Sequence, residues 1–170
     1  KAVSYSYLGD KLLSSVDATG SNSSYTYDAV GNISSITNPN GGVTNYTYDL
    51  NNNVTSESIG EGYKITYKYN ALNLLEEKTN SRGHNTTYTY DLLGRITSQT
   101  DELGTISYTY DNNGNVLTVT DEAGTITRTY DKLNRITSYK DTKGKVIRYE
   151  YDSLDNLSKL TYPDGKEVTY

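Results

Sequence analysis

Polar and apolar side chains alternate along short runs of the chain, and residues 105–110 give the clearest example. Ile106, Tyr108 and Tyr110 lie at every second position of this run, and Thr or Ser fills the positions between them. Strict alternation with a period of two is typical of a β-strand that is half-buried on one face. The pattern therefore predicts a chain built from strands.

The Tyr-x-Tyr phrase at the end of this run recurs at a nearly fixed spacing. Its second Tyr returns every 20 or 21 residues, at Tyr7, Tyr27, Tyr48, Tyr69, Tyr90, Tyr110, Tyr130 and Tyr151. A period this regular indicates tandem structural repeats. A phrase repeated in this way is more typical of architecture than of a catalytic motif, which is needed once.

Each period divides into a strand, a turn, a second strand and a linking turn. The first turn follows the pattern Asp-x-x-[Gly/Asn/Asp], in which Asp bonds amides ahead of it and the fourth residue tolerates positive φ. An apolar residue heads the second strand: Ile33, Val54, Leu75, Ile96, Val116, Ile136 or Leu157. The linking turn is usually [Asp/Asn]-x-x-Gly. Two copies, after Gly104 and Gly124, are one residue shorter, and we place the loss in the turn or the strand start, because a slip inside the strand would reverse its faces.

One such hairpin is marginally stable alone, so the repeats are predicted to gain stability from their neighbours. We expect an all-β fold in which antiparallel β-hairpins of about 21 residues form one long, twisted, curling sheet. The Tyr/Ile face would line the inside of the curl and the Thr/Ser/Lys/Asp face would meet water. Residues 1–170 are predicted to be a single continuous array of about eight repeats, with a ninth beginning near 165–170. Both ends look cut, which favours a fragment of a longer protein.

The composition and net charge limit the classes of binding partner that the chain could have. The chain is 34% hydrophobic, its 19 Tyr supply all of the aromatic residues, and it has no Cys. Periodic Tyr and β-branched residues argue against disorder. A net charge of −5 argues against a nucleic-acid or acidic-membrane partner. No apolar run approaches a membrane span, and no signal peptide opens the chain.

Two copies of the phrase carry a family resemblance: Tyr88-Thr89-Tyr90-Asp91-Leu92-Leu93-Gly94-Arg95-Ile96 and Tyr25-Thr26-Tyr27-Asp28-Ala29-Val30-Gly31-Asn32-Ile33. They resemble the RHS repeat, also called the YD repeat, and the likeness covers essentially the whole chain. The resemblance implies long bacterial surface or secreted proteins, including wall-associated proteins and polymorphic toxins, and the related animal teneurins. It also implies a sheet that spirals into a hollow β-shell, which in toxin members encloses a C-terminal effector. The family's Asp-Pro-rich autoproteolytic segment has no counterpart here.

The repeat signature is assigned to the Tyr pairs, the turn Asp and the turn Gly. Its residues are Tyr25, Tyr27, Asp28, Gly31, Tyr46, Tyr48, Asp49, Tyr67, Tyr69, Tyr88, Tyr90, Asp91, Gly94, Tyr108, Tyr110, Asp111, Gly114, Tyr130, Asp131, Tyr149, Tyr151 and Asp152. Some copies depart from it. Asn70 replaces the turn Asp, Arg128 replaces a first Tyr, and Tyr63, Tyr139 and Tyr162 are additional; Arg128 could pair with an acid or form a polar spot.

Catalytic and metal sites are not predicted. The turn Asp residues supply one carboxylate each, whereas Ca²⁺ needs six to eight converging oxygens, so turn capping is the better interpretation. His84, the only imidazole, lies in the linking turn Ser81-Arg82-Gly83-His84 without an ordered nucleophile or acid beside it. We therefore predict no enzyme, no cofactor and no metal.

Two functions stay open at this stage. The first is a non-catalytic structural module, part of a shell that encloses or displays a toxin or effector in a secreted or cell-wall protein; its partners are the rest of the shell and the effector. The second is a carbohydrate- or receptor-binding module that uses the Tyr-rich face. The isolated chain is also expected to self-associate through strand edges and the Tyr-rich face.

Overall fold

The computed structural model describes residues 2–170, and the chain divides into two compact units with the boundary between Thr87 and Tyr88. All regular elements in the described residues are β-strands. The first unit contains β1 (Ser4–Leu8), β2 (Lys11–Val16), β3 (Asn22–Tyr27), β4 (Ile33–Thr37), β5 (Val43–Tyr48), β6 (Val54–Ile59), β7 (Tyr63–Tyr69), β8 (Leu75–Asn80) and the start of β9 (Asn85–Tyr90).

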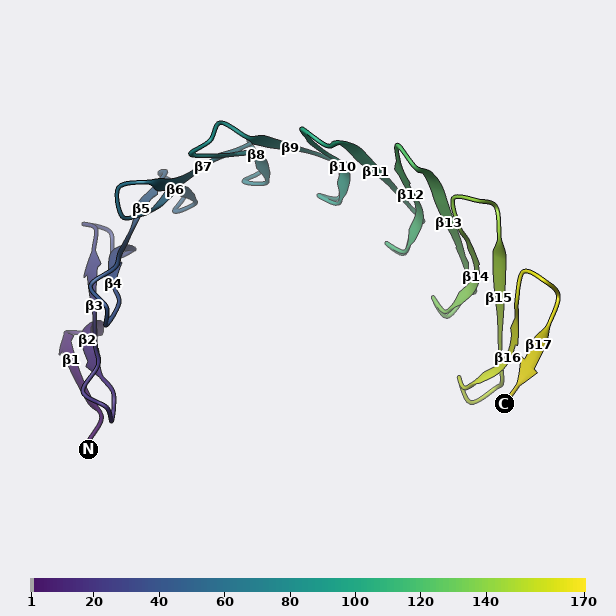
Figure 1. Cartoon of the computed structure of the whole chain (residues 1–170), viewed down its shortest axis with the longest axis horizontal. Helices are drawn as coiled ribbons and strands as arrows, with labels where there is room; N and C mark the ends of the chain where they lie inside the picture. The colour runs from purple at the N-terminus through teal and green to yellow at the C-terminus, as the bar shows by residue number, and fades with distance from the viewer. Residues whose placement is uncertain (1) are drawn as a thin grey trace. The chain divides into compact units, whose positions relative to one another are not determined.

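The second unit takes the end of β9 and the remaining strands. These are β10 (Ile96–Asp101), β11 (Gly104–Tyr110), β12 (Val116–Asp121), β13 (Gly124–Tyr130), β14 (Ile136–Lys140), β15 (Val146–Tyr151), β16 (Leu157–Thr161) and β17 (Glu167–Thr169). In Figure 1 the strands of each unit follow one another in chain order. Short β17 lies where the sequence predicts the ninth repeat to begin.

Every strand pairs antiparallel with its neighbours in the chain. Within one repeat, β3 pairs with β4 and sets Tyr25 opposite Ile36. Between repeats, β4 pairs with β5 and sets Ile36 opposite Thr44. The same two ladders alternate through both units, so the predicted all-β array of antiparallel hairpins is confirmed. The second strands begin at the apolar residues that the sequence marked as their heads.

The recurring β-bulge of the hairpins was not predicted. In β3–β4 the register passes from Thr26 opposite Ser35 to Tyr27 opposite Ile33, so Ser34 is an extra residue. Corresponding shifts occur in the other hairpins whose register is described. A bulge bends its strand and increases the local twist. The spacing of the apolar residues indicates the bulge. Ile33 and Ile36 are three residues apart, so in a regular strand they would lie on opposite faces. They share a face only because the bulge adds one residue between them.

The face opposite the Tyr residues is joined by hydroxyl groups. The Oγ1 atom of Thr47 lies 2.8 Å from Oγ1 of Thr55, the bulge residue, and 2.7 Å from Oγ of Ser56. Thr26, Thr89 and Thr129 form the same pair of contacts in their hairpins. Two hairpins replace the hydroxyl pair with an ion pair, Lys68–Glu77 and Glu150–Lys159, each at 2.7 Å. Cross-strand pairs of this kind contribute to sheet stability.

The described residues contain no buried hydrophobic side chain, and Ser56, at 8% exposure, is their one buried residue. The array is a single layer whose side chains are mostly half-exposed on both faces. Stability therefore depends on contacts along the sheet and not on a core between layers. No helix in residues 2–170 has the length and apolarity that a membrane span requires.

The linking turns come in two lengths. In the two shorter copies, Asp101 pairs with Gly104 and Asp121 with Gly124, so each loop has two residues. Most longer copies close a four-residue turn instead, as where Gly20 N–H donates to the Asp17 carbonyl at 3.0 Å. The residue is lost from the turn, as predicted, and the facing of β11 and β13 is preserved.

Candidate functional site: the junction between repeats

The carboxylate of each hairpin turn organises the turn backbone. In β5–β6, Oδ1 of Asp49 accepts hydrogen bonds from the backbone N–H groups of Asn51 and Asn53, both at 2.9 Å. The same pair of bonds is made by Asp28, Asp91, Asp111, Asp131 and Asp152. Asn70, the departing copy, makes it with its amide oxygen to Leu72 and Leu74. The predicted capping role of these residues is thus visible in their contacts.

The fourth turn residue has positive φ, which explains why Gly, Asn or Asp stands there. The values are 104° at Gly31, 64° at Asn52, 59° at Asn73, 77° at Gly94, 91° at Gly114, 64° at Asn134 and 67° at Asp155. Only these residue types enter this region at low cost. The residue after it begins the connection between repeats.

Except at Leu74, this next residue is Asn or Arg, and in most copies it binds its own turn and the following one. Nδ2 of Asn53 donates to Oδ2 of Asp49 at 3.0 Å and to Oδ1 of Asn73, in the next turn, at 3.0 Å. Asn32 reaches Asn52 in the same way at 2.8 Å, and Asn115 reaches Asn134 at 2.7 Å. A polar side chain therefore joins successive turns along one rim of each unit.

Arginine makes the stronger form of this connection in the second unit. Arg95 donates from Nε to Oδ2 of Asp91 at 2.6 Å and from a terminal nitrogen to the Asp111 carbonyl at 2.8 Å. Its guanidinium lies over the Tyr110 ring, 4.6 Å from the ring centre. Arg135 lies over Tyr151 at the same distance. One side chain thus combines an ion pair, a backbone hydrogen bond and a cation–π contact across a repeat boundary.

Six of the second Tyr residues bind the preceding repeat through their hydroxyl groups. The hydroxyl of Tyr48 donates to the Ile33 carbonyl at 2.8 Å, and that of Tyr110 donates to the Ile96 carbonyl at 2.7 Å. Four more hydroxyls do the same, with Tyr27 reaching Leu12, Tyr69 Val54, Tyr130 Val116 and Tyr151 Ile136. In every case the acceptor belongs to the head of the second strand of the repeat before.

The backbone carbonyl that accepts the Tyr hydroxyl lies just beyond the end of the ladder that pairs one repeat with the next. Between β4 and β5 the pairing extends from Thr37 opposite Val43 to Ser35 opposite Asn45, and it does not continue to Ile33. An unpaired, part-buried carbonyl is costly, so the Tyr48 hydroxyl supplies the missing donor where the strands separate. We call this hydrogen bond the tyrosine clamp.

The first Tyr of each phrase instead faces its cross-strand neighbour, and this pairing explains the Arg128 departure. Arg128 lies directly opposite Tyr139, one of the additional Tyr residues. Its guanidinium is 5.8 Å from the centre of the Tyr139 ring. In this hairpin the aromatic residue of the pair is Tyr139 on the second strand and not a Tyr on the first strand. The Arg128 guanidinium contacts the Tyr139 ring, and not an acidic side chain as the sequence suggested.

These contacts shift the pKa values of the turn Asp carboxyls and of the clamp Tyr phenols. The side-chain hydrogen bond from Asn53 holds the pKa of the Asp49 carboxyl below its ordinary value, and the Arg95 backbone N–H does the same for the pKa of Asp91. Burial raises the pKa of the Tyr48 and Tyr69 phenols above 10.0, so their hydroxyls remain protonated donors at neutral pH.

Acid is therefore expected to destabilise the array only at low pH. The folded-state pKa of the turn Asp residues lies below the ordinary 3.8, so their contribution is complete above that value and is lost as the pH falls through the lower folded value. The urea midpoint should stay nearly constant from pH 7 to about pH 5 and fall steeply below about pH 4. Circular dichroism in a pH series of urea titrations measures it. A midpoint that falls mainly between pH 7 and pH 5 would contradict the assignment.

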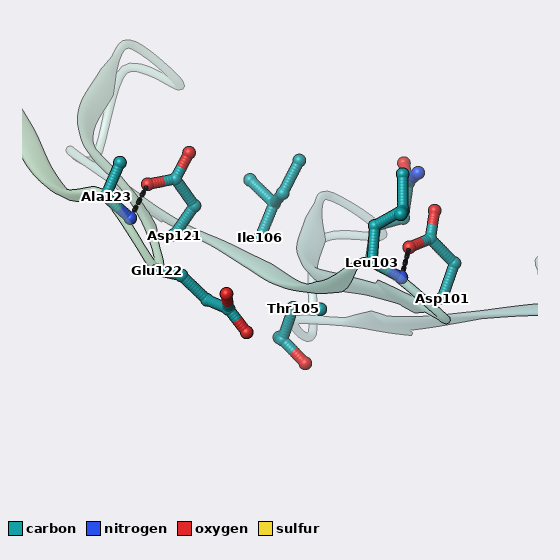
Figure 2. A pocket seen from close by; sticks show the side chains of 9 residues that line it. Asp101, Leu103, Thr105, Ile106, Asp121, Glu122 and Ala123 are labelled. Carbon is teal, nitrogen blue, oxygen red and sulfur yellow. Dashed lines mark hydrogen bonds between the residues drawn. The ribbon is translucent and has the colours of Figure 1, made fainter.

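A hollow of about 320 Å³ lies between two linking turns (Figure 2). Leu103 and Asp101 stand at one side of it, Asp121 and Ala123 at the other, and Ile106 between them. Each Asp holds its own turn, since Asp101 accepts from Leu103 N–H and Asp121 from Ala123 N–H, both at 2.8 Å. No group of three or more possible metal ligands occurs in residues 2–170.

His84 lies beside another hollow, of about 200 Å³, that is also lined by Tyr63, Ile65, Lys78, Asn80 and Thr86. Its backbone N–H donates to Oδ1 of Asn80 at 3.2 Å. The lining contains neither a carboxylate nor a serine that could form a catalytic set with the imidazole. The residues that recur in the chain are thus gathered at the junctions between repeats and not around a cavity.

The signature residues divide into three positions. Six second Tyr residues form the clamps, the first Tyr residues lie on the sheet face, and the Asp and Gly residues form the turns. The sequence analysis missed the residue after the turn Gly as a contact residue. The recurrence of Asn or Arg at this position, in Asn32, Asn53, Arg95, Asn115, Arg135 and Asn156 with Leu74 as the exception, is the signal that could have identified it.

Comparison with known proteins gives two family matches. The teneurin YD-shell model matches residues 61–170, and the RHS repeat model matches residues 5–43 and 27–64. No match was found among curated proteins. Solved structures share the fold: the Tc holotoxin pore of Photorhabdus luminescens has a TM-score of 0.69 at 18% identity over 85% of this chain and 9% of that one. A TcdB2–TccC3 complex without its hypervariable C-terminal region has a TM-score of 0.61 at 18% identity, over 91% of this chain and 11% of that one.

Fold and junctions together define a class: a tandem β-hairpin array whose recurring side chains connect one repeat to the next. With a family model that matches residues 61–170, the chain belongs to the RHS-repeat, YD-shell family. It spans about a tenth of the length of the solved chains that it resembles. Membership supports a structural shell role.

Proposed function

We propose that this chain is a wall segment of a β-shell, in which residues 1–170 form one continuous, curling array. The shell would enclose or display a C-terminal effector in a secreted or cell-wall bacterial protein, and the segment itself would be non-catalytic. Family membership and the likeness to Tc toxin structures support this proposal. The rest of the shell and the effector would be its partners.

The tyrosine clamp is the observation that carries the proposal. Six phenol hydroxyls at equivalent positions are each used on the backbone of the repeat before. A wall needs continuity from one repeat to the next, and the clamp supplies it where the linking ladder ends. The half-exposed first Tyr residues would then face the contents of the shell.

Limited proteolysis of the full-length parent protein tests this function. An enclosed effector should resist a protease that digests it rapidly after denaturation. Changing Tyr48, Tyr110 and Tyr130 together to Phe should shorten its survival, because the wall opens more often. The matched control changes the first Tyr residues Tyr46 and Tyr108 to Phe and should leave survival unchanged. An effector digested equally fast in native and denatured protein would overturn the shell proposal.

A second candidate is glycan or receptor binding on the Tyr face of the first unit. Tyr46 lies opposite Glu57 and Tyr67 opposite Lys78, so phenol rings and charged groups share a half-exposed surface. The Tyr67 hydroxyl lies 3.4 Å from Oε2 of Glu57. Aromatic rings beside polar groups can stack on and hydrogen-bond to sugars. Saturable binding on a glycan array that is lost with Tyr67→Ala would favour this candidate over a wall segment alone.

A further inference from the structure

Cationic side chains gather at two successive linking turns of the second unit. They line a hollow of about 400 Å³, to which Lys143, Lys145 and Arg148 contribute. A second hollow, of about 430 Å³, shares Lys145, Tyr162 and Pro163 with the first and adds Lys166. We call the two together the basic hollow.

The charge of the basic hollow is not balanced within the chain. The three cations of the first hollow are exposed and form no ion pair in residues 2–170. The Asp141 carboxylate is used by its own turn, because it accepts from the backbone N–H groups of Lys143 and Lys145 at 2.9 Å and 2.8 Å. In the next turn, Asp164 pairs with Lys166 at 2.9 Å. Positive charge therefore remains for a partner outside the chain.

Arg148 departs from the pattern of the hydroxyl face. It lies opposite Ser138 on β14 and Thr161 on β16 and shares their face. Equivalent positions in other repeats carry short polar side chains: Ser24, Asn45, Thr66, Ser107 and Thr127. The ladder forms with these short residues, so the array does not require a cation at this position.

Tyr162 departs from the pattern of the linking turns. Four other linking turns have a capping Asp or Asn at its position: Asp17, Asn38, Asn80 and Asp141. Backbone hydrogen bonds close the Tyr162 turn, where Gly165 N–H donates to the Tyr162 carbonyl at 2.9 Å, and Pro163 suits the second turn position. The phenol is 42% exposed and lines both parts of the basic hollow. The turn thus places an exposed aromatic ring beside the cations.

The two departures fit a ligand that combines negative charge with a ring. Lys and Arg pair with carboxylates through charge-assisted hydrogen bonds, and an exposed Tyr offers a stacking face with a polar tip. The two preceding linking turns carry acids, among them Asp101, Asp121 and Glu122 (Figure 2). A long polyanion that followed this rim would meet like charges there. A short acidic sugar chain therefore fits the basic hollow better than a nucleic acid does.

We propose that the basic hollow binds an acidic oligosaccharide, a short sugar chain that carries carboxylate groups. Lys143, Lys145 and Arg148 pair with the carboxylates, and the Tyr162 ring stacks on a sugar ring. This site is separate from the Tyr face of the first unit. It is also independent of the wall-segment role, which the protease experiment tests by itself.

Isothermal titration calorimetry on the intact chain tests the ligand class. A trimer of galacturonic acid should bind saturably and at least about tenfold more tightly than the neutral trimer of galactose, because only the acidic trimer pairs with the cations. Equal affinities, or no saturable binding of the acidic trimer, would overturn the proposal. Binding at least as tight of inorganic phosphate, of phosphatidylglycerol vesicles or of a short RNA would also overturn it, since the sugar would then not be the preferred ligand.

The repeats supply variants that should fold. Lys145→Ser with Arg148→Ser restores the residue types of Ser21 and Ser24, and the pair should weaken binding of the acidic trimer at least about tenfold. The matched control is Lys64→Ser with Lys132→Ser, which removes the same charge from exposed positions elsewhere. The control should leave the affinity unchanged, and both pairs should keep the urea midpoint close to that of the unchanged chain. Equal losses in the two pairs would overturn the proposal, because net charge alone would then explain the binding.

Tyr162→Asn tests the ring contact, because it restores the residue found at Asn38 and Asn80. It should weaken binding of the acidic trimer at least about threefold without lowering the urea midpoint. An unchanged affinity in this variant would overturn the assignment of a sugar to the basic hollow.

Discussion

Replacement of Tyr110 with Ala is expected to lower the free energy of unfolding by about 2–3 kcal/mol, and replacement with Phe by about 1 kcal/mol. Phe removes only the hydrogen bond to the Ile96 carbonyl and leaves that part-buried acceptor without its donor. Ala also removes the ring that lies beneath the Arg95 guanidinium. Urea titrations followed by circular dichroism measure both changes.

Tyr108 provides the matched control in the same strand. In the part of the chain that the structure describes, its ring lies opposite Val119 and its hydroxyl makes no hydrogen bond. Tyr108→Phe should therefore change stability by less than about 0.5 kcal/mol. If Tyr110→Phe costs no more than Tyr108→Phe, the clamp contributes nothing and the second Tyr is retained for packing alone.

Loss of one tyrosine clamp should also destabilise the two repeats that it joins. In an array without a core, each repeat draws its stability from the interfaces on its two sides. Amide exchange in Tyr110→Phe should accelerate first at the head of β10, where the Ile96 carbonyl has lost its donor, and along β11. The clamp is thus a local contact with an effect along the sheet.

The strand order and strand boundaries could be predicted because the same strand and turn patterns recur in every repeat of the sequence. Alternation in 105–110 identifies a strand, the Asp-x-x-Gly turn closes a hairpin, and the recurrence at 20 or 21 residues multiplies both. Ile33 and Val116 begin β4 and β12 as the apolar heads required. Local rules suffice here because every ladder whose register is described joins strands that are adjacent in the chain.

The clamp could not be predicted from the same rules. Alternation places Tyr48 on a face of the sheet but gives no reason for its hydroxyl to meet Ile33, which is 15 residues earlier. That contact depends on where the linking ladder ends, which in turn depends on the bulge at Ser34. In the sequence, a bulge is indicated only by two apolar residues three positions apart, and this spacing is easily taken for an irregular strand pattern.

Arg128 shows how the array tolerates a departure. Its position loses the first Tyr, but Tyr139 on the opposing strand restores an aromatic ring to the same pair. The unit of the pattern on this face is therefore the cross-strand pair and not the single residue. A sequence read along one strand misses this, because the compensating residue is 11 positions away.

Replacement of Asp91 with Ala is the second large effect that we expect, as a clear fall in the urea midpoint of unfolding. The carboxylate accepts from the backbones of Leu93 and Arg95 and also pairs with the Arg95 guanidinium at 2.6 Å. Its removal leaves two turn amides without their acceptor and releases the Arg that spans the repeat boundary. Urea titration measures the loss, and amide exchange at Leu93 and Arg95 locates it.

Asparagine separates the two parts of this effect. Asp111→Asn should leave the urea midpoint nearly unchanged, because its partner is neutral Asn115 and because Asn70 already forms the same turn with an amide oxygen. Asp91→Asn should lower the urea midpoint measurably, but by less than Asp91→Ala, since it keeps the turn but breaks the ion pair with half-buried Arg95. Equal costs for the two Asn variants would show that the Arg connection adds no stability. A cost for Asp91→Ala no larger than that for Asp91→Asn would contradict the role of the carboxylate in holding the turn.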